Sequence, residues 1–230
     1  RGVTQVSSWV DQVIASFLPA GAVAMLGYAQ TLYLLPVSLF GMSVSSAELP
    51  ELSSGVGAAA LRERLDAALR RVAFLVVPSA VAFALLGDRV VALVFQTGAF
   101  GAEDVRIVWA VLAGSAVGLL AMTLGRLYAS AFWALHDTRT PLRFAMLRVA
   151  ASAALGVLLA FGGPRALGLD ARLGLAGLTL ASGLAGWLEM LLLRRALNAR
   201  VGKTGLPASF SLRVWGAALG AAAAGWCAKL

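Results

Sequence analysis

Residues 28–53 have the sequence Tyr28-Ala-Gln-Thr-Leu-Tyr-Leu-Leu-Pro-Val-Ser-Leu-Phe-Gly-Met-Ser-Val-Ser-Ser-Ala-Glu-Leu-Pro-Glu-Leu-Ser53. The run is long enough for a membrane span, which needs about 20 mostly apolar residues. Its first turn is polar, yet polar groups within a bilayer are tolerated only where they face protein or water. The stretch therefore predicts a helix that lines a wet cavity, with Pro36, Gly41 and Pro50 as hinge residues.

The composition of the whole chain agrees with a membrane protein. The chain has 230 residues, of which 60% are hydrophobic, and a mean hydropathy of +0.85. A soluble domain is about 45–50% apolar. The formal net charge of +8 would suit nucleic-acid binding in a soluble protein. Here the charges are clustered between apolar runs, which favours loop charge at a membrane surface and no nucleic-acid partner.

The apolar runs predict seven transmembrane helices, at about 5–25, 28–49, 68–87, 105–134, 141–162, 172–195 and 210–228. Helices rather than strands are expected because the runs are long, rich in Ala and Leu, and without strict alternation. The predicted fold class is therefore an all-α integral membrane protein. Because the chain begins at Arg1 directly before a span, we expect it to be part of a longer protein.

Basic residues are distributed unevenly between alternate connections. Twelve belong to the segments after the second, fourth and sixth spans, with the start of the fifth span counted in the second of these segments: Arg62, Arg64, Arg70, Arg71, Arg139, Arg143, Arg148, Arg194, Arg195, Arg200, Lys203 and Arg213. Five belong to the alternate set: Arg89, Arg106, Arg165, Arg172 and Lys229. Since cytoplasmic loops carry the excess of Lys and Arg, we expect the first set and the N-terminal end of the chain on the cytoplasmic side.

Two further features are predicted on the basic side. Residues 58–71 carry charged side chains that can pair along one side of an amphipathic helix, which we expect on the membrane surface before the third span, as a solvated connector rather than a specific lipid site. Glu189 comes shortly before Arg194 and Arg195 in the sixth span. We expect it to pair with these two arginines at the interface.

Candidate cavity residues come first from the opening stretch, which contributes Gln30, Thr31 and Tyr33. Arg126 is a further candidate near the end of the fourth span. Its side chain either contacts substrate or extends to the lipid headgroups.

The first span has a polar face at helical spacing, formed by Gln5, Ser8, Gln12 and Ser16. Asp11 lies at its edge, and we take Asp11, Gln12 and Ser16 as candidates for the cavity wall. Two interpretations of Asp11 stay open. It is either a cavity or ion-coupling group, or an interfacial carboxylate held by Ser7 or Ser8.

Several classes of site are disfavoured by composition. Cys227 is the single cysteine and His136 the single histidine, so no internal disulfide, zinc site or haem site is expected. No Gly-rich phosphate loop and no paired-carboxylate motif is present, which disfavours an enzyme of lipid-linked sugar metabolism. We therefore expect no cofactor, no metal site and no enzymatic activity.

Four ordered segments carry a family resemblance: Asp11-Gln-Val-Ile-Ala-Ser-Phe-Leu-Pro-Ala-Gly21; Tyr28-Ala through Leu35-Pro36 with Phe40-Gly41 and Leu49-Pro-Glu-Leu-Ser53; Val94-Phe-Gln-Thr-Gly-Ala-Phe100; and Tyr128-Ala-Ser-Ala-Phe-Trp-Ala-Leu-His-Asp-Thr-Arg-Thr-Pro141. Together they resemble the MurJ (MviN) lipid II flippases of the multidrug/oligosaccharidyl-lipid/polysaccharide exporter superfamily. The match is specific from Arg1 to about Pro141 and general afterwards.

The resemblance implies two six-helix lobes around a central cavity in the bacterial inner membrane. Residues 1–198 would be the second lobe, residues 199–230 a connector with one additional helix, and the first lobe would lie outside this chain. The implied activity is the movement of lipid II, an undecaprenyl-diphosphate-linked peptidoglycan precursor, from the inner to the outer leaflet by alternating access. The implied partners are this substrate, the membrane lipids and the first lobe.

One departure from the family pattern concerns substrate binding. Where the family has Tyr-Ala-Asp-Arg, with an arginine expected to hold the diphosphate, this chain has Tyr28-Ala-Gln-Thr31. Arg126 does correspond to a basic residue of the family. The resemblance also leaves the energy source open between the membrane potential and a coupling ion, for which Asp11 is one candidate ligand. The alternatives are a flippase for another undecaprenyl-linked glycan and a non-transporting membrane scaffold.

Overall fold

The structure is a computed structural model that describes residues 2–42 and 57–227. Within these ranges the regular elements are all helices. The α-helices are α1 (Gly2–Ser16), α2 (Ala22–Pro36), α4 (Ala58–Phe95), α5 (Ala102–Ala134), α6 (Arg139–Val157), α7 (Gly163–Leu167), α8 (Gly174–Val201) and α9 (Ala208–Cys227). Two π-helices, η1 (Val37–Met42) and η2 (Leu158–Gly162), and one 3₁₀-helix, η3 (Ala171–Leu173), extend them.

Five helical stretches of the described chain are long and apolar enough to cross a membrane: Ala22–Leu39, Ala58–Phe95, Ala102–Ala134, Arg139–Leu167 and Ala171–Val201. They confirm the predicted all-α membrane fold. Of the other two predicted spans, 5–25 covers most of the 15-residue helix α1 and the start of α2, and 210–228 corresponds to the 20-residue helix α9. The number of crossings therefore stays a prediction.

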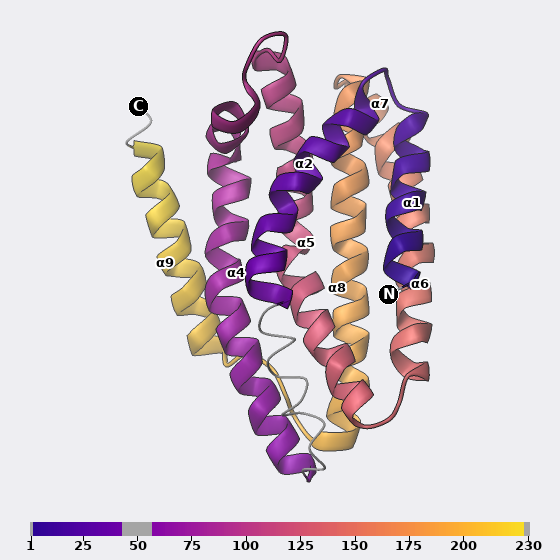
Figure 1. Cartoon of the computed structure of the whole chain (residues 1–230), viewed down its shortest axis with the longest axis vertical. Coiled ribbons are helices and arrows are strands. Elements are labelled where there is room, and N and C mark those ends of the chain that lie inside the picture. The colour runs from indigo at the N-terminus through magenta and orange to yellow at the C-terminus, as the bar shows by residue number, and fades with distance from the viewer. Residues whose placement is uncertain (1, 43–56, 228–230) are drawn as a thin grey trace.

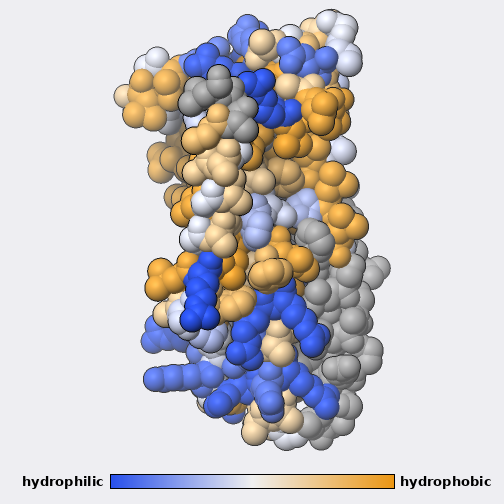
Figure 2. Space-filling model, turned by 90° about the vertical axis from the view of Figure 1, so that its left-hand side faces the viewer, coloured by the Kyte–Doolittle hydropathy of each residue, from blue (hydrophilic) through white to orange (hydrophobic). Residues whose placement is uncertain are grey.

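The long helices run alternately up and down in one bundle (Figure 1). This arrangement brings the N-terminal ends of α4, α6 and α9 together with the C-terminal ends of α5 and α8. Hydrophilic residues gather at both ends of the molecule and most extensively at this lower end, with an apolar band between them (Figure 2). Arginines such as Arg62, Arg139 and Arg200 belong to the helix ends that meet there.

The two central helices, α5 and α8, approach each other most closely at a crossing formed by glycines. Gly118 and Gly183 meet at the crossing, where a Cβ built on Gly118 would lie 2.4 Å from Gly183 Cα. Thr179 Oγ1 donates a hydrogen bond to Val111 O at 2.9 Å, which joins α8 to α5 near this point. Small residues allow such close approach of membrane helices. The remaining helices pack around this pair, α4 and α2 on α5, and α6 on α8.

Helix α4 corrects one prediction. Residues 58–71 are not a separate helix on the membrane surface, because they form the first turns of the continuous 38-residue helix α4. Leu61, Leu65 and Leu69 are buried, so the apolar face of this segment packs into the protein rather than onto lipid. No Gly or Pro occurs between residue 58 and Pro78, so the sequence contains no helix breaker that would separate this segment from the rest of α4.

The first predicted span, 5–25, is divided. Helix α1 ends at Ser16 and α2 begins at Ala22. Gly21 has φ +90°, a left-handed conformation that glycine adopts without steric cost. The chain reverses here, so α1 and α2 form two adjacent walls of the bundle (Figure 1).

The turn between α5 and α6 is closed by Asp137. Its carboxylate accepts hydrogen bonds from the backbone N–H groups of Arg139 and Thr140, both at 3.0 Å, and from the Thr140 hydroxyl. It also pairs with Arg200 of α8 at 2.6 Å. The Thr140 hydrogen bonds, followed by the Arg200 guanidinium, hold the pKa of the Asp137 carboxyl well below its usual range. The carboxylate of Asp137 thus satisfies two backbone N–H groups at the start of α6.

The connector between α8 and α9 is attached to the bundle. The Gly205 N–H donates to Asp66 Oδ1 of α4 at 2.8 Å, and Arg194 Nε donates to Thr204 O at 3.1 Å. Helix α9 then packs along α4. The division of the chain at residues 198 and 199 stays a prediction.

Candidate functional site

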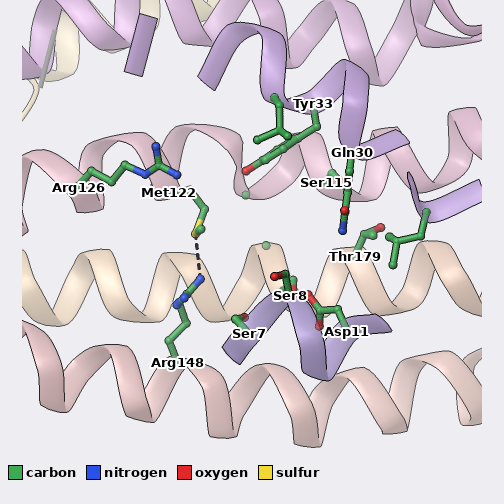
Figure 3. Close-up of a pocket in the computed structure, with 15 residues that line it drawn as sticks. Ser7, Ser8, Asp11, Gln30, Tyr33, Ser115, Met122, Arg126, Arg148 and Thr179 are labelled. Atoms are coloured by element: carbon green, nitrogen blue, oxygen red, sulfur yellow. Dashed lines mark hydrogen bonds between the residues drawn. The ribbon is translucent and has the colours of Figure 1, made fainter. Parts of the chain in front are cut away.

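A cavity of about 430 Å³ lies between α1, α2, α5, α6 and α8. Its polar lining is contributed by all five helices: Ser7, Ser8, Asp11, Gln30, Tyr33, Ser115, Arg126, Arg148, Thr179 and Ser182. The apolar part of the wall includes Leu26, Leu34 and Met122 together with the crossing glycines of α5 and α8. Figure 3 shows the polar side chains converging from opposite helices. A polar cavity inside an apolar bundle is the environment that a charged headgroup would need within a membrane.

Four predicted candidates are on the wall of this cavity: Asp11, Gln30, Tyr33 and Arg126. Asp11 Oδ2 accepts a hydrogen bond from Ser182 Oγ of α8 at 2.9 Å. Asp11 is thus held across the bundle by α8, which favours its interpretation as a cavity group. The role of these four residues in substrate handling stays a prediction.

Three other candidates, Gln12, Ser16 and Thr31, are exposed and are not part of this lining. Ser16 Oγ donates to Val13 O at 2.7 Å, and Thr31 Oγ1 donates to Gly27 O at 3.0 Å. Both hydroxyls are therefore hydrogen-bonded within their own helix, a common way for Ser and Thr to be accommodated in a membrane helix.

The α1 face that meets the cavity runs through Ser7, Ser8 and Asp11. The spacing pattern selects a neighbouring face, through Ser8 and Gln12, because it weighs polarity and not the position of the other helices. One residue corresponds to about 100° of rotation, so a small error of phase moves a side chain out of the cavity.

The three predicted hinge residues have different outcomes. Pro36 is the last residue of α2, and the chain continues from it as the π-helix η1, which contains Gly41. The change of helix type falls where the proline removes a backbone donor. Pro50 lies outside the described residues. Hinge motion at these positions stays a prediction.

The main residues that the pattern did not select are Arg148 and Glu189. Arg148 Nε lies 3.0 Å from Glu189 Oε2, and the two side chains are 6% and 18% exposed. Arg148, which was counted on the basic side with the start of the fifth span, is instead buried in α6 beside the cavity. The predicted pairing of Glu189 with Arg194 and Arg195 is wrong. One signal could have found the pair, since charges of opposite sign deep within two apolar runs are expected to pair.

Arg126 and Arg148 occupy one end of the cavity, on either side of Met122 (Figure 3). Arg126 lies eight residues before the end of α5, and Arg148 lies nine residues after the start of α6. At about 1.5 Å per residue both are roughly 12–14 Å from the basic end of the bundle. Asp11, Gln30 and Thr179 lie toward the other end of the view. The cavity is thus cationic on the side nearer the basic end.

Asp11 anchors a short chain of hydroxyl groups at its own end of the cavity. Ser182 Oγ, which donates to Asp11, also lies 2.8 Å from Ser152 Oγ of α6. Among the described residues, Asp11 Oδ1 has no hydrogen-bond partner. In the same part of the chain, no group of three or more His, Cys, Asp or Glu side chains is placed to hold a metal ion.

Comparison with known proteins identifies the family. The family model described as "Lipid II flippase MurJ" matches residues 1–228. The chain belongs to the MurJ family. The MurJ fold is confirmed by a solved structure titled "Lipid II flippase MurJ, inward closed conformation", which superimposes with a TM-score of 0.85 at 24% identity and covers 99% of this chain and 46% of that one.

Curated MurJ proteins are similar over most of the chain. A probable lipid II flippase MurJ of Rhizobium tropici is 35% identical over 82% of this chain and 34% of its own length. The lipid II flippase MurJ of Burkholderia cenocepacia is 33% identical over 86% of this chain and 37% of its own length. The chain therefore spans about a third of the length of these relatives.

Proposed function

We propose that the protein containing this chain is a lipid II flippase, and that this chain supplies one wall of its transport cavity. The observation that carries the proposal is the polar cavity within an apolar bundle, with Arg126 and Arg148 at one end. Its relatives in the MurJ family are named lipid II flippases, or probable ones. A diphosphate-linked glycan needs a polar, cationic path, whereas its lipid tail can stay in the bilayer.

We also propose that the basic end of the bundle faces the cytoplasm. The helix ends gathered there carry Arg62, Arg64, Arg139, Arg194 and Arg200, and cytoplasmic loops carry the excess of such residues. The cationic end of the cavity is then nearer the leaflet in which the substrate starts. An inside-negative potential favours outward movement of an anion by about 2.3 kcal/mol per charge per 100 mV.

The test is complementation by the full-length protein in bacteria depleted of their own lipid II flippase. Growth and the amount of lipid II in the outer leaflet are both scored. We expect the parent protein to restore both, and Arg126→Gln to reduce outer-leaflet lipid II at least about tenfold, the effect of losing one charged contact.

The matched control is Arg139→Gln, at an exposed arginine of the same end of the bundle outside the cavity. It should behave as the parent. Absence of rescue by an inserted and abundant parent protein would reject lipid II as the substrate and leave another undecaprenyl-linked glycan to be tested in the same way.

A further inference from the structure

The ion pair between Arg148 and Glu189 uses only one edge of the guanidinium group. Glu189 Oε2 lies beside Nε at 3.0 Å. The other edge turns toward the cavity, where Nη1 donates to Met122 Sδ at 3.4 Å (Figure 3). A thioether is a weak acceptor, and a guanidinium has five N–H donors in a fixed fork. The cavity edge of Arg148 is therefore a strong donor group with a weak partner.

A second guanidinium lies across the same methionine. Arg126 reaches the cavity from α5, on the opposite side of Met122 from Arg148 (Figure 3). None of the described residues forms an ion pair with Arg126. Asp11 is within electrostatic reach of Arg148, but its carboxylate is hydrogen-bonded to Ser182. Two guanidinium groups facing one space suit an anion with several oxygen atoms, such as a diphosphate.

Glu189 gives this site a second property. A carboxylate 3.0 Å from Nε cancels much of the positive potential that Arg148 projects into the cavity. Arg148 can then stay charged and buried when the cavity is empty, because an unpaired buried charge is costly. The same carboxylate weakens the attraction of Arg148 for any bound anion. Transport requires an affinity that permits release, so a permanent counter-ion is useful there.

We propose that Arg148 binds the diphosphate of a polyprenyl-linked substrate through its Nη groups, and that Glu189 is the fixed counter-ion that keeps this binding weak enough for release. The inference rests on the proposed function, since it specifies which group of that substrate is held at this end of the cavity. It makes Arg148 an anion-binding residue and Glu189 a residue that acts through it.

The test is equilibrium binding of undecaprenyl diphosphate to the full-length protein in nanodiscs. We expect Arg148→Gln to weaken binding about tenfold or more, since it removes a charged, forked donor. We expect Glu189→Gln to tighten binding about tenfold or more, because it removes a negative charge 3.0 Å from the guanidinium group that holds the ligand. The same Glu189 variant should lower the rate of lipid II transport, as release becomes slower.

The double variant Arg148→Gln with Glu189→Gln removes both charges together, which avoids an unpaired buried charge if a single variant folds poorly. It should bind as weakly as Arg148→Gln. The matched control is the exposed ion pair of Arg172 and Glu103, 3.2 Å apart on the opposite end of the bundle. Neutralising either partner of that pair should leave binding unchanged.

Three results would overturn the inference. Parent-like affinity in the Arg148 and double variants would make the ion pair purely structural. Weaker binding in Glu189→Gln would show that Glu189 positions Arg148 for binding rather than lowering its affinity for the anion. If binding to phosphatidylglycerol vesicles depended on Arg148 to the same extent, the site would be a general one for anionic lipids.

A different outcome separates this inference from the proposed function. Arg148-dependent binding of undecaprenyl diphosphate without lipid II transport would uphold this site and reject the proposed substrate.

Discussion

The crossing of α5 and α8 provides a quantitative test of the packing. In Gly118→Ala, the added Cβ would lie 2.4 Å from Gly183 Cα, whereas ordinary contact begins at 3.4 Å. The obstacle is backbone, so it cannot rotate away, and the two helices must separate locally by the difference of about 1.0 Å. A gap of this size forfeits a quarter to a half of each van der Waals contact of about 0.1–0.2 kcal/mol. For on the order of 40 atom pairs around the crossing, the loss is about 2 kcal/mol.

Hydrogen bonds between the helices add to this loss. Thr179 donates to Val111 O at 2.9 Å and Trp187 Nε1 donates to Val117 O at 2.8 Å, both from α8 to α5. The same separation of the helices would stretch both hydrogen bonds. Losing each would cost about 0.6 kcal/mol of stability, the average for hydrogen bonds between membrane helices. The higher helix propensity of alanine relative to glycine offsets about 1 kcal/mol of this loss of stability. We therefore expect Gly118→Ala to lower the free energy of unfolding by about 2 kcal/mol.

The measurement is thermal unfolding of the full-length protein in detergent, followed by tryptophan fluorescence. At about 2–4 °C per kcal/mol for a unit of this size, the midpoint should fall by about 4–8 °C. The matched control is Gly125→Ala on the same helix, where the nearest atom is Met190 Cβ at an ordinary 3.8 Å. That variant should be as stable as the parent or slightly more so. Equal midpoints for the two variants would refute the close packing described here.

Two further predictions concern the turn and the cavity. Asp137→Asn should lower the unfolding midpoint at pH 7, because it removes the carboxylate that accepts from Thr140 and pairs with Arg200. The pKa of the Asp137 carboxyl is lower in the folded state than in the unfolded state. The ionised carboxylate therefore stabilises the fold fully above the unfolded-state pKa of about 3.9, and this stabilisation is lost as the pH falls below that value. The difference between parent and variant should therefore shrink below about pH 4, and a constant difference would contradict this. Gln30→Leu should reduce lipid II transport more than Thr31→Leu, since Gln30 lines the cavity and Thr31 is exposed. An equal loss of transport in the two variants would contradict this assignment of the cavity wall.

Much of the fold follows from the sequence because each apolar run must satisfy its own backbone in lipid. Local signals also act independently of tertiary structure. Asp137, four residues before Pro141, accepts hydrogen bonds from two backbone N–H groups at the start of α6, a position that short acidic side chains favour. The same holds for the start of α5, where Asp104 accepts from the Gly101 N–H at 2.9 Å.

Predictions failed where the outcome depends on a partner helix. The charged segment 58–71 has the composition of a surface helix, and only its packing shows that Leu61 and Leu65 are buried. In the same way, the pairing of Glu189 depends on which face of α8 meets α6. A residue near in sequence, Arg194, is turned instead toward Thr204. Sequence distance is a poor guide to pairing between helices that cross.

The sequence predicted that the bundle has a polar cavity, but it identified only some of the residues that line the cavity. Gln30, Tyr33 and Asp11 could be selected because polar side chains in apolar runs seek protein or water. Arg148 was missed because an arginine nine residues inside a span can be counted equally well with the loop before it. At 1.5 Å per residue it lies about 14 Å from the start of α6, well inside the helix.

The contacts around the cavity also differ in kind, and this bears on how it could open. Helices α5 and α8 meet through the backbone at Gly118 and Gly183, and at that crossing no side chain can change rotamer to accommodate sliding. Helix α1 is joined to α8 through the Asp11 and Ser182 side chains, and α2 is joined to α4 by the ring of Tyr28, 5.0 Å from that of Phe95. Side-chain contacts can be remade in a new arrangement, whereas interdigitated backbones cannot shift by small steps. Because α2 also continues into a π-helix at Pro36, we expect the α1–α2 side to move and the α5–α8 pair, which carries Arg126, to stay fixed.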